Sequence, residues 1–265
     1  SITATKVYLS SPMSVDWISL DDLYSGYGYG VSNAFSGDTT YGFNTNIAVS
    51  TSKIFAEFKD YAGATAFTLV DGSGVETLDV SEYSDHQVID LRATDKAATN
   101  LYASNIGGSV GNLTIAAGTV IENAVGGTGD DSIRGNAANN LLDGGAGDDT
   151  LLGGDGDDLY VVDSTSDVVT ESSGEGTDLI QSSVSYTLPN HTENIQIIGG
   201  LTRTATGNSL NNILTGNAAS STLAGAGGND TYIISNANNV VTESSNEGTD
   251  LIQASVSYTL PNHTE

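Results

Sequence analysis

Glycine and apolar positions recur with a period of nine along residues 126–161. The four consecutive units read GGTGDDSIR, GNAANNLLD, GGAGDDTLL and GGDGDDLYV, and three more, GNSLNNILT, GNAASSTLA and GAGGNDTYI, begin at Gly207. Every unit starts with glycine and places an apolar residue at its eighth position: Ile133, Leu142, Leu151, Tyr160, Leu214, Leu223 and Tyr232. Such regular self-similarity predicts a repeat architecture.

The nine-residue pattern predicts a turn of about six residues followed by a short strand. Glycine costs about 1 kcal/mol per position in a helix, so the units do not favour helices. Side chains alternate across a strand, so the eighth residue can point inward while its neighbours face water. Two units then form one coil, with units one and three stacked on one side and units two and four on the other. We therefore expect an all-β fold, a parallel β-roll or β-solenoid of short strands with ion-binding turns.

Other patterns flank these units. SVDWISLDDLY at 14–24 predicts one short helix, whereas KIFAEFKDY and NLTIAAGTVIENAV predict strands. VVTESSGEGTDLIQSSVSYTLPNHTE from Val168 returns almost unchanged from Val240, an offset of 72 residues. We expect four regions with no flexible linker between them: the remnant of a preceding domain (1–40), a β-rich lead-in (41–125), the roll (126–170), and a degenerate, truncated repeat region (171–265).

The charge balance indicates what kind of partner such a surface can have. Asp and Glu total 33 against 7 Lys and Arg, giving a net charge of −26. Nucleic acids and anionic membranes require basic patches, so both are disfavoured as partners, and cations are favoured. The chain contains no cysteine, which excludes disulfides and thiolate metal sites. No apolar run reaches the length needed to span a membrane.

Position six carries the candidate chemistry. It is occupied in turn by Asp131, Asn140, Asp149, Asp158, Asn212, Ser221 and Asp230. Stacked coils would bring Asp131 to Asp149, where like charges repel. Backbone carbonyls and carboxylates together make an all-oxygen cage, which suits calcium better than magnesium or zinc. The alternative is that these side chains only form turns by bonding to the backbone, an alternative with more weight in residues 207–233, where Asn and Ser dominate.

These units resemble the RTX calcium-binding nonapeptide of type I-secreted bacterial proteins. The resemblance implies a β-roll with several calcium ions between successive turns. It implies a best site on Gly126, Thr128, Asp131, Gly145, Gly147 and Asp149, and a weaker one on Gly135, Ala137, Asn140, Gly154, Gly156 and Asp158. Asp167 falls at position six of VDSTSDVVT, and Asp178 and Asp250 are further candidates with a looser fit. Asp230 is at position six of its unit but is expected to face only Asn212. We expect the second array to be the poorer binder.

A second resemblance covers residues 10–160. The segments SPMSVDWISLDDLY, GDTTYGFNTN, VETLDVSEYSDHQVIDL and GNLTIAAGTVIENAVGGTGDDSIRGNAANN are similar to those of the serralysin family of secreted zinc proteases, at the end of the catalytic domain and the start of the C-terminal calcium domain. The family's acidic calcium motif before the last lead-in strands is replaced by VDGSGVETLDVSEY, with Asp71 and Glu76.

The zinc motif of that protease family, HExxHxxGxxH, does not occur in this chain. The three histidines are His86, His191 and His263, and the last two share one place in the 72-residue repeat. We interpret them as structural residues. The chain by itself is therefore expected to be non-catalytic, with a zinc metalloprotease as its possible parent.

Three functions remain open. The first is a calcium-folded C-terminal module of a serralysin-like metalloprotease, which leaves a Gram-negative cell through a type I exporter and folds outside, with a catalytic domain elsewhere in the protein. The second is a structural or adhesive surface protein, favoured by the 72-residue repeat. The third is an accessory module of another secreted hydrolase.

Overall fold

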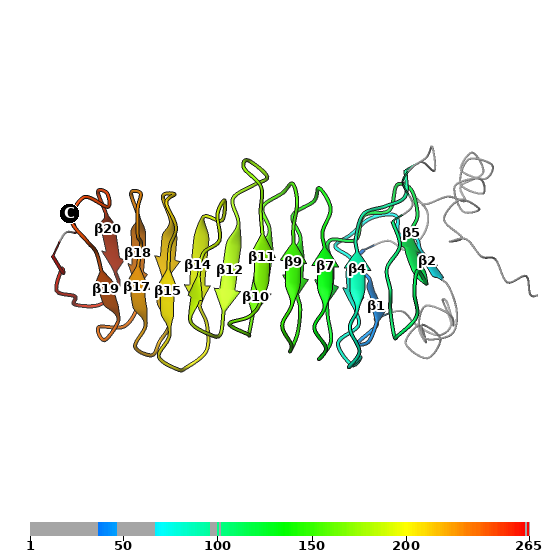
Figure 1. Ribbon diagram of the computed structural model, residues 1–265, viewed down its shortest axis with the longest axis horizontal. Coiled ribbons are helices and arrows are strands. Elements are labelled where there is room, and N and C mark those ends of the chain that lie inside the picture. The colour runs from blue at the N-terminus through cyan, green and yellow to red at the C-terminus, as the bar shows by residue number, and fades with distance from the viewer. Residues whose placement is uncertain (1–36, 47–66, 96–99, 101, 263, 265) are drawn as a thin grey trace, which may run out of the picture.

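The protein is an all-β solenoid of parallel strands in the computed structural model, which describes residues 37–46, 67–95, 100, 102–262 and 264 (Figure 1). The strands lie side by side along one long axis; from residue 123 onward the chain advances coil by coil toward the C-terminal end, whereas the lead-in strands at 67–69 and 113–115 lie together at the opposite end. This confirms the predicted fold class. The helix predicted at 14–24 and the strand predicted at 53–61 lie outside the described residues.

Consecutive strands of the roll alternate between one long sheet and shorter sheets. The long sheet has ten strands in the order β1 (Thr40–Gly42), β3 (Thr77–Asp79), β6 (Asn123–Val125), β8 (Leu141–Asp143), β10 (Leu159–Val162), β12 (Leu179–Ser182), β14 (Asn194–Ile197), β16 (Ile213–Thr215), β18 (Thr231–Ile234) and β20 (Leu251–Ala254). The others are β4 (Val88–Asp90), β7 (Ser132–Arg134), β9 (Thr150–Leu152) and β11 (Val168–Thr170); β13 (Tyr186–Thr187), β15 (Thr204–Thr206), β17 (Thr222–Ala224) and β19 (Val240–Thr242); and β2 (Phe67–Leu69) with β5 (Leu113–Ile115).

The register places the eighth residues of successive units directly on one another. Ile133 of β7 is opposite Leu151 of β9, and Leu142 of β8 is opposite Tyr160 of β10. Units one and three, and units two and four, therefore stack as predicted. All seven eighth residues are at most 1% exposed, whereas the strand residues beside them are more exposed. They belong to one continuous apolar core, which the alternation of side chains across each strand produces.

The second array continues the first without a break in the long sheet. Ile195 of β14, Leu214 of β16 and Tyr232 of β18 follow one another in register. The turn that joins β11 to β12 spans residues 171–178, longer than the turn at 153–158 that joins β9 to β10. This longer turn changes the spacing between stacked positions and decides the geometry of one acidic cluster.

Candidate metal centre

The sixth residues form buried columns at the ends of the turns. In one column the backbone N–H of Asp131 donates to Asp149 Oδ1 at 2.7 Å, and the N–H of Asp149 donates to Asp167 Oδ1 at 2.9 Å. All three side chains are at most 5% exposed. The structure therefore brings Asp131 to Asp149 as expected and adds Asp167 to the same column.

A second column joins Asn140, Asp158 and Asp178. The N–H of Asn140 donates to Asp158 Oδ1 at 2.6 Å, and the N–H of Asp158 donates to Asp178 Oδ1 at 2.9 Å. Asp178 stands 20 residues after Asp158, not 18, because the intervening turn is longer. Its loose fit to the nine-residue frame therefore does not displace it from the column.

Glycines let neighbouring turns approach within backbone contact. Gly145 and Gly147 adopt φ of 83° and 141°, a region that side chains with a Cβ rarely enter. A Cβ on Gly145 would collide with the carbonyl oxygen of Gly127, and one on Gly147 would lie 2.6 Å from that of Gly129. The carbonyl-lined turn is thus present at the predicted first site.

The remaining predicted glycines lie in equivalent places. Gly154 and Gly156 also have positive φ, and they approach the carbonyls of the turn that holds Gly135 and Ala137. Gly126 lies against Gly144 of the next turn, and the N–H of Thr128 donates to Tyr83 of the lead-in at 2.9 Å. These contacts bring the turns of two coils close enough for oxygens from both to bind the same ion.

Several of these carboxylates keep one oxygen with no hydrogen-bond partner. The buried atoms are Asp149 Oδ2, Asp158 Oδ2, Asp178 Oδ2 and Asp230 Oδ2. Burial first, with a smaller contribution from neighbouring carboxylates, raises the pKa of Asp149 and Asp158 to about 7 and that of Asp178 and Asp230 to about 6. A buried charge without a partner is costly, so these oxygens fit a cation of the hard, oxygen-binding kind.

Two acidic residues that the nonapeptide frame did not identify belong to this arrangement. Glu171 follows β11 and Glu243 follows β19, at the place that glycine holds at the start of each nonapeptide turn. Each joins a cluster of carboxylates with the sixth residues. The signal was in the sequence: both copies of the 72-residue repeat read VVTESS, with glutamate in place of glycine.

In the second array, Asp230 has neighbours on both sides. The N–H of Asn212 donates to Asp230 Oδ1 at 2.7 Å, and the N–H of Asp230 donates to Asp250 Oδ1 at 2.9 Å. The expectation that Asp230 would face only Asn212 is therefore incomplete. The long turn before β20 places Asp250 beside it, as the equivalent turn places Asp178 beside Asp158.

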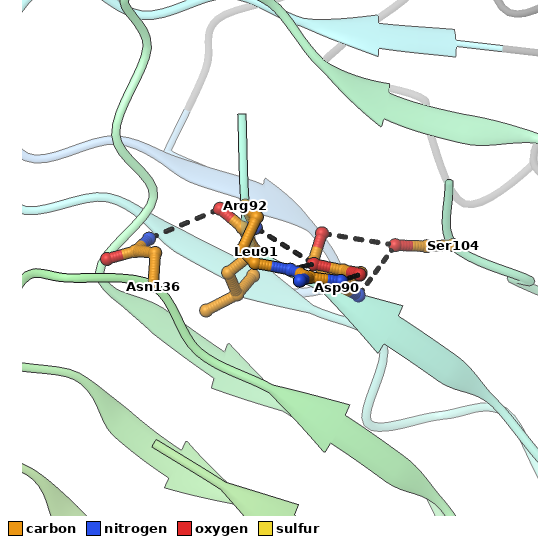
Figure 2. A network of polar contacts seen from close by, with 5 residues as sticks. All are labelled: Asp90, Leu91, Arg92, Ser104 and Asn136. Atoms are coloured by element: carbon orange, nitrogen blue, oxygen red, sulfur yellow. Dashed lines mark hydrogen bonds and ion pairs between the residues drawn. The ribbon is translucent and has the colours of Figure 1, made fainter. Parts of the chain in front are cut away.

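Asparagine amides donate to converging backbone carbonyls at other turns. Figure 2 shows the first case, where Asn136 Nδ2 reaches the carbonyl oxygen of Leu91, next to the Asp90–Arg92 ion pair. The same amide donates to Ile121 at 2.8 Å. In the second array Asn208 Nδ2 donates to the carbonyls of Pro189 and Thr192 at 2.7 and 2.8 Å. An amide here supplies the positive hydrogens that converging carbonyls need.

The lead-in holds its own acidic cluster. Tyr41 donates its hydroxyl to Asp71 Oδ2 at 2.7 Å, and the N–H of Glu76 donates to Glu122 Oε2 at 2.8 Å. Glu76 is 2% exposed, and burial, followed by its bond to Glu122, raises its pKa to about 8. Asp71 and Glu76 are thus buried, and Glu122 beside them is half-buried.

The two described histidines, His86 and His191, lie in connections between strands. His86 is exposed and contacts the carbonyl oxygen of Asp130 through Nδ1, and His191 is exposed with a φ of 66°. His263 lies outside the described residues. The two clusters of possible metal ligands found in the described part of the chain contain only carboxylates. The described residues also form no helix long and apolar enough to cross a membrane.

Comparison with known proteins agrees with this architecture. Residues 32–257 match the family model of the C-terminal domain of peptidase M10 serralysins. The chain is 40% identical over 131 residues to metallopeptidase AprA of Pseudomonas marginalis, 39% over 131 residues to serralysin of Photorhabdus laumondii, and 40% over 124 residues to serralysin A of Dickeya chrysanthemi. These matches cover 47–49% of this chain and 23–24% of each relative's length.

Proposed function

Because this chain belongs to the family of peptidase M10 serralysin C-terminal domains, we propose that it is the calcium-folded C-terminal module of a type I-secreted, serralysin-like metalloprotease. The chain spans about a quarter of the length of the relatives it matches, so proteolysis would reside in a catalytic domain elsewhere in the parent protein. The module itself contributes folding and export competence.

The observation that carries this proposal is the set of unpartnered carboxylate oxygens inside the turns. Asp149 Oδ2 and Asp158 Oδ2 are buried in side chains that are at most 2% exposed. Calcium accepts six to eight oxygens in flexible geometry, whereas magnesium gives up its waters reluctantly and zinc prefers nitrogen and sulfur. Oxygen atoms from Asp149, Asp158 and the glycine carbonyls would hold it.

The same residues make folding depend on the ion. Without a cation, the columns Asp131–Asp149–Asp167 and Asn140–Asp158–Asp178 place acids one above another inside a chain whose net charge is −26. Glycine-rich turns add a large loss of backbone entropy on ordering. Extracellular calcium modules bind at roughly 10⁻⁴ to 10⁻³ M, so the chain would stay unfolded in the cytosol and fold after export.

Circular dichroism of the EDTA-treated chain, titrated with calcium and with magnesium as the control, tests this proposal. We expect a coil-to-β transition with calcium and none with magnesium at equal concentration. The exposed Asp155 provides a matched control for charge, since Asp155→Asn should leave the calcium midpoint unchanged while Asp149→Asn raises it. A chain fully folded in EDTA and unaffected by calcium would contradict the proposal.

A structural surface protein is the second candidate, favoured by one observation. The second array extends the long sheet in the same register, with Leu214 opposite Tyr232 and Tyr232 opposite Ile252. A protease needs no such extension, whereas a scaffold gains length from it. The sequence of the full-length gene separates the two: a zinc motif before this segment supports the protease, and further 72-residue copies after it support the scaffold.

A further inference from the structure

A second kind of acidic cluster lies where the long turn meets the roll. Glu171, Asp158 and Asp178 each contribute a carboxylate oxygen, and these atoms all lie within 4.8 Å of one another. The three residues are 6%, 2% and 1% exposed. Each keeps one buried oxygen without a hydrogen-bond partner: Glu171 Oε2, Asp158 Oδ2 and Asp178 Oδ2.

A tyrosine orients the glutamate in this cluster. Tyr160 donates its hydroxyl to Glu171 Oε1, which leaves Oε2 as the oxygen without a partner. The eighth residue is leucine or isoleucine in the other units, and it is tyrosine only in the two units whose coil ends in a glutamate-led turn. Gly153 keeps the space open, because a Cβ there would collide with Asp158 Oδ2 and with the Tyr160 hydroxyl.

We propose that Asp158, Glu171 and Asp178 form a buried three-carboxylate calcium site that differs from the nonapeptide turn sites. This inference rests on the proposed calcium-dependent function and deepens it. Two oxygens bound to one calcium ion at 2.3–2.6 Å can be at most about 5 Å apart, so the observed spacing fits one ion. The cluster is too buried to retain the waters that magnesium keeps.

The charge around this site explains why it would bind more tightly than the adjoining turn site at Asn140. Its three ligands carry three negative charges when ionised. In the adjoining turn site of the same column, Asp158 is paired with the neutral Asn140. The groups that act electrostatically on Asp158 and Glu171 include Glu175 and Asp157, all of them acidic. More carboxylate ligands give higher calcium affinity, so this site fills before the turn site at Asn140 in a titration.

The site recurs once in each 72-residue copy. Asp230, Glu243 and Asp250 form the second cluster, and Tyr232 donates its hydroxyl to Glu243 as Tyr160 does to Glu171. Asp230 Oδ2 is buried without a partner, like Asp158 Oδ2. The second array, in which Asn and Ser occupy most sixth positions, therefore has one strong site of its own.

Calcium titration calorimetry and terbium luminescence on the full chain test the assignment. Glu171→Gln keeps the shape of the side chain and removes its charge, and Asp155→Asn removes an exposed charge from the adjoining turn. We expect Glu171→Gln to lower the affinity of one calcium site by roughly tenfold or more, with no change for Asp155→Asn. Tyr160→Phe should retain the ion but lower the tyrosine-sensitised terbium emission, since the phenol contacts a ligand.

The outcomes separate this inference from the proposed function. If the wild-type chain binds calcium and Glu171→Gln binds the same number of ions with the same affinities, the three-carboxylate site is refuted while the calcium-folded module stands. If Glu171→Gln does not fold, unchanged terbium emission in Tyr160→Phe refutes the site independently. If the wild-type chain binds no calcium, both proposals fail.

Discussion

Asp149 provides a direct test of why these turns need a cation. Its Oδ1 accepts a hydrogen bond from the N–H of Asp131, and its Oδ2 is buried without a partner. Asp149→Asn keeps the size of the side chain and the acceptor but removes the charge. Asparagine already occupies the sixth position at Asn140 and Asn212, so the fold tolerates an amide there.

The expected effect follows from the pKa of Asp149, which rises from 3.8 to about 7, chiefly through burial. A rise of this size means that ionising the folded side chain costs at most about 4 kcal/mol, at 1.36 kcal/mol per pKa unit. Protonation favours the folded ion-free state, so its stability is full below about pH 4 and is lost as the pH rises through about 7. Asp149→Asn removes this loss.

The assay is urea unfolding in EDTA at pH values from 4 to 8, for wild type and variant. The same concentration of a stabilising osmolyte is added to both proteins so that the ion-free state is folded enough to measure. We expect the variant to be more stable by up to about 4 kcal/mol at pH 8, with the gain vanishing near pH 4. In saturating calcium the order should reverse. Equal or lower stability of the variant in EDTA at pH 8 would refute the electrostatic reasoning.

Three further predictions concern the apolar core, the asparagine side chains that donate to turn carbonyls, and the pH dependence of calcium affinity. Leu151→Ala should lower the free energy of unfolding in saturating calcium by about 2–5 kcal/mol, because Leu151 is fully buried between Ile133 and Val169. As the control, Val168→Ala should change it by less than about 0.5 kcal/mol, because Val168 is half-exposed. Equal effects of the two substitutions would contradict the stacking of eighth residues in the core. Asn208→Ala removes the two hydrogen bonds that its amide donates to the carbonyls of Pro189 and Thr192 and should cost roughly 1–3 kcal/mol in urea unfolding in saturating calcium, with the number of bound calcium ions unchanged in calorimetry. The loss of one ion would mean that this turn binds it. Calcium affinity should fall as the pH drops from about 8 to 6, because Asp149 and Asp158, whose pKa is about 7, must be ionised to bind the ion. Calorimetry in buffers of different ionisation enthalpy should detect proton uptake from the buffer when the ion is released. A pH-independent affinity would exclude these two carboxylates as ligands.

Much of the candidate site could be predicted from spacing alone. The eighteen-residue step from Asp131 to Asp149 and on to Asp167 follows from two nine-residue units per coil, and the structure places all three in one column. The inward position of Leu142 follows from the alternation of side chains in a strand. Both are local consequences of a strict period. The identity of the bound ion stays a prediction.

Glu171 could not be predicted in the same way. It lies outside the sixth-position frame, and its approach to Asp158 depends on the path of the eight-residue turn at 171–178. The amide closures are similar: Asn136 reaches Leu91 and Ile121, which are 45 and 15 residues away. Such pairings depend on which coil lies below, and no local pattern specifies that.

The sequence by itself determined the solenoid, because a nine-residue alternation of flexible glycine turns and short apolar strands has one way to bury every eighth side chain. It also determined the excess of acid that calls for a cation. Only the tertiary structure decided which oxygens are left without a partner, and therefore which turns can hold an ion and which an amide already closes. The turn at 171–178 is one example: it is two residues longer than the turn at 153–158, yet it keeps Asp178 stacked on Asp158 and places Glu171 beside both.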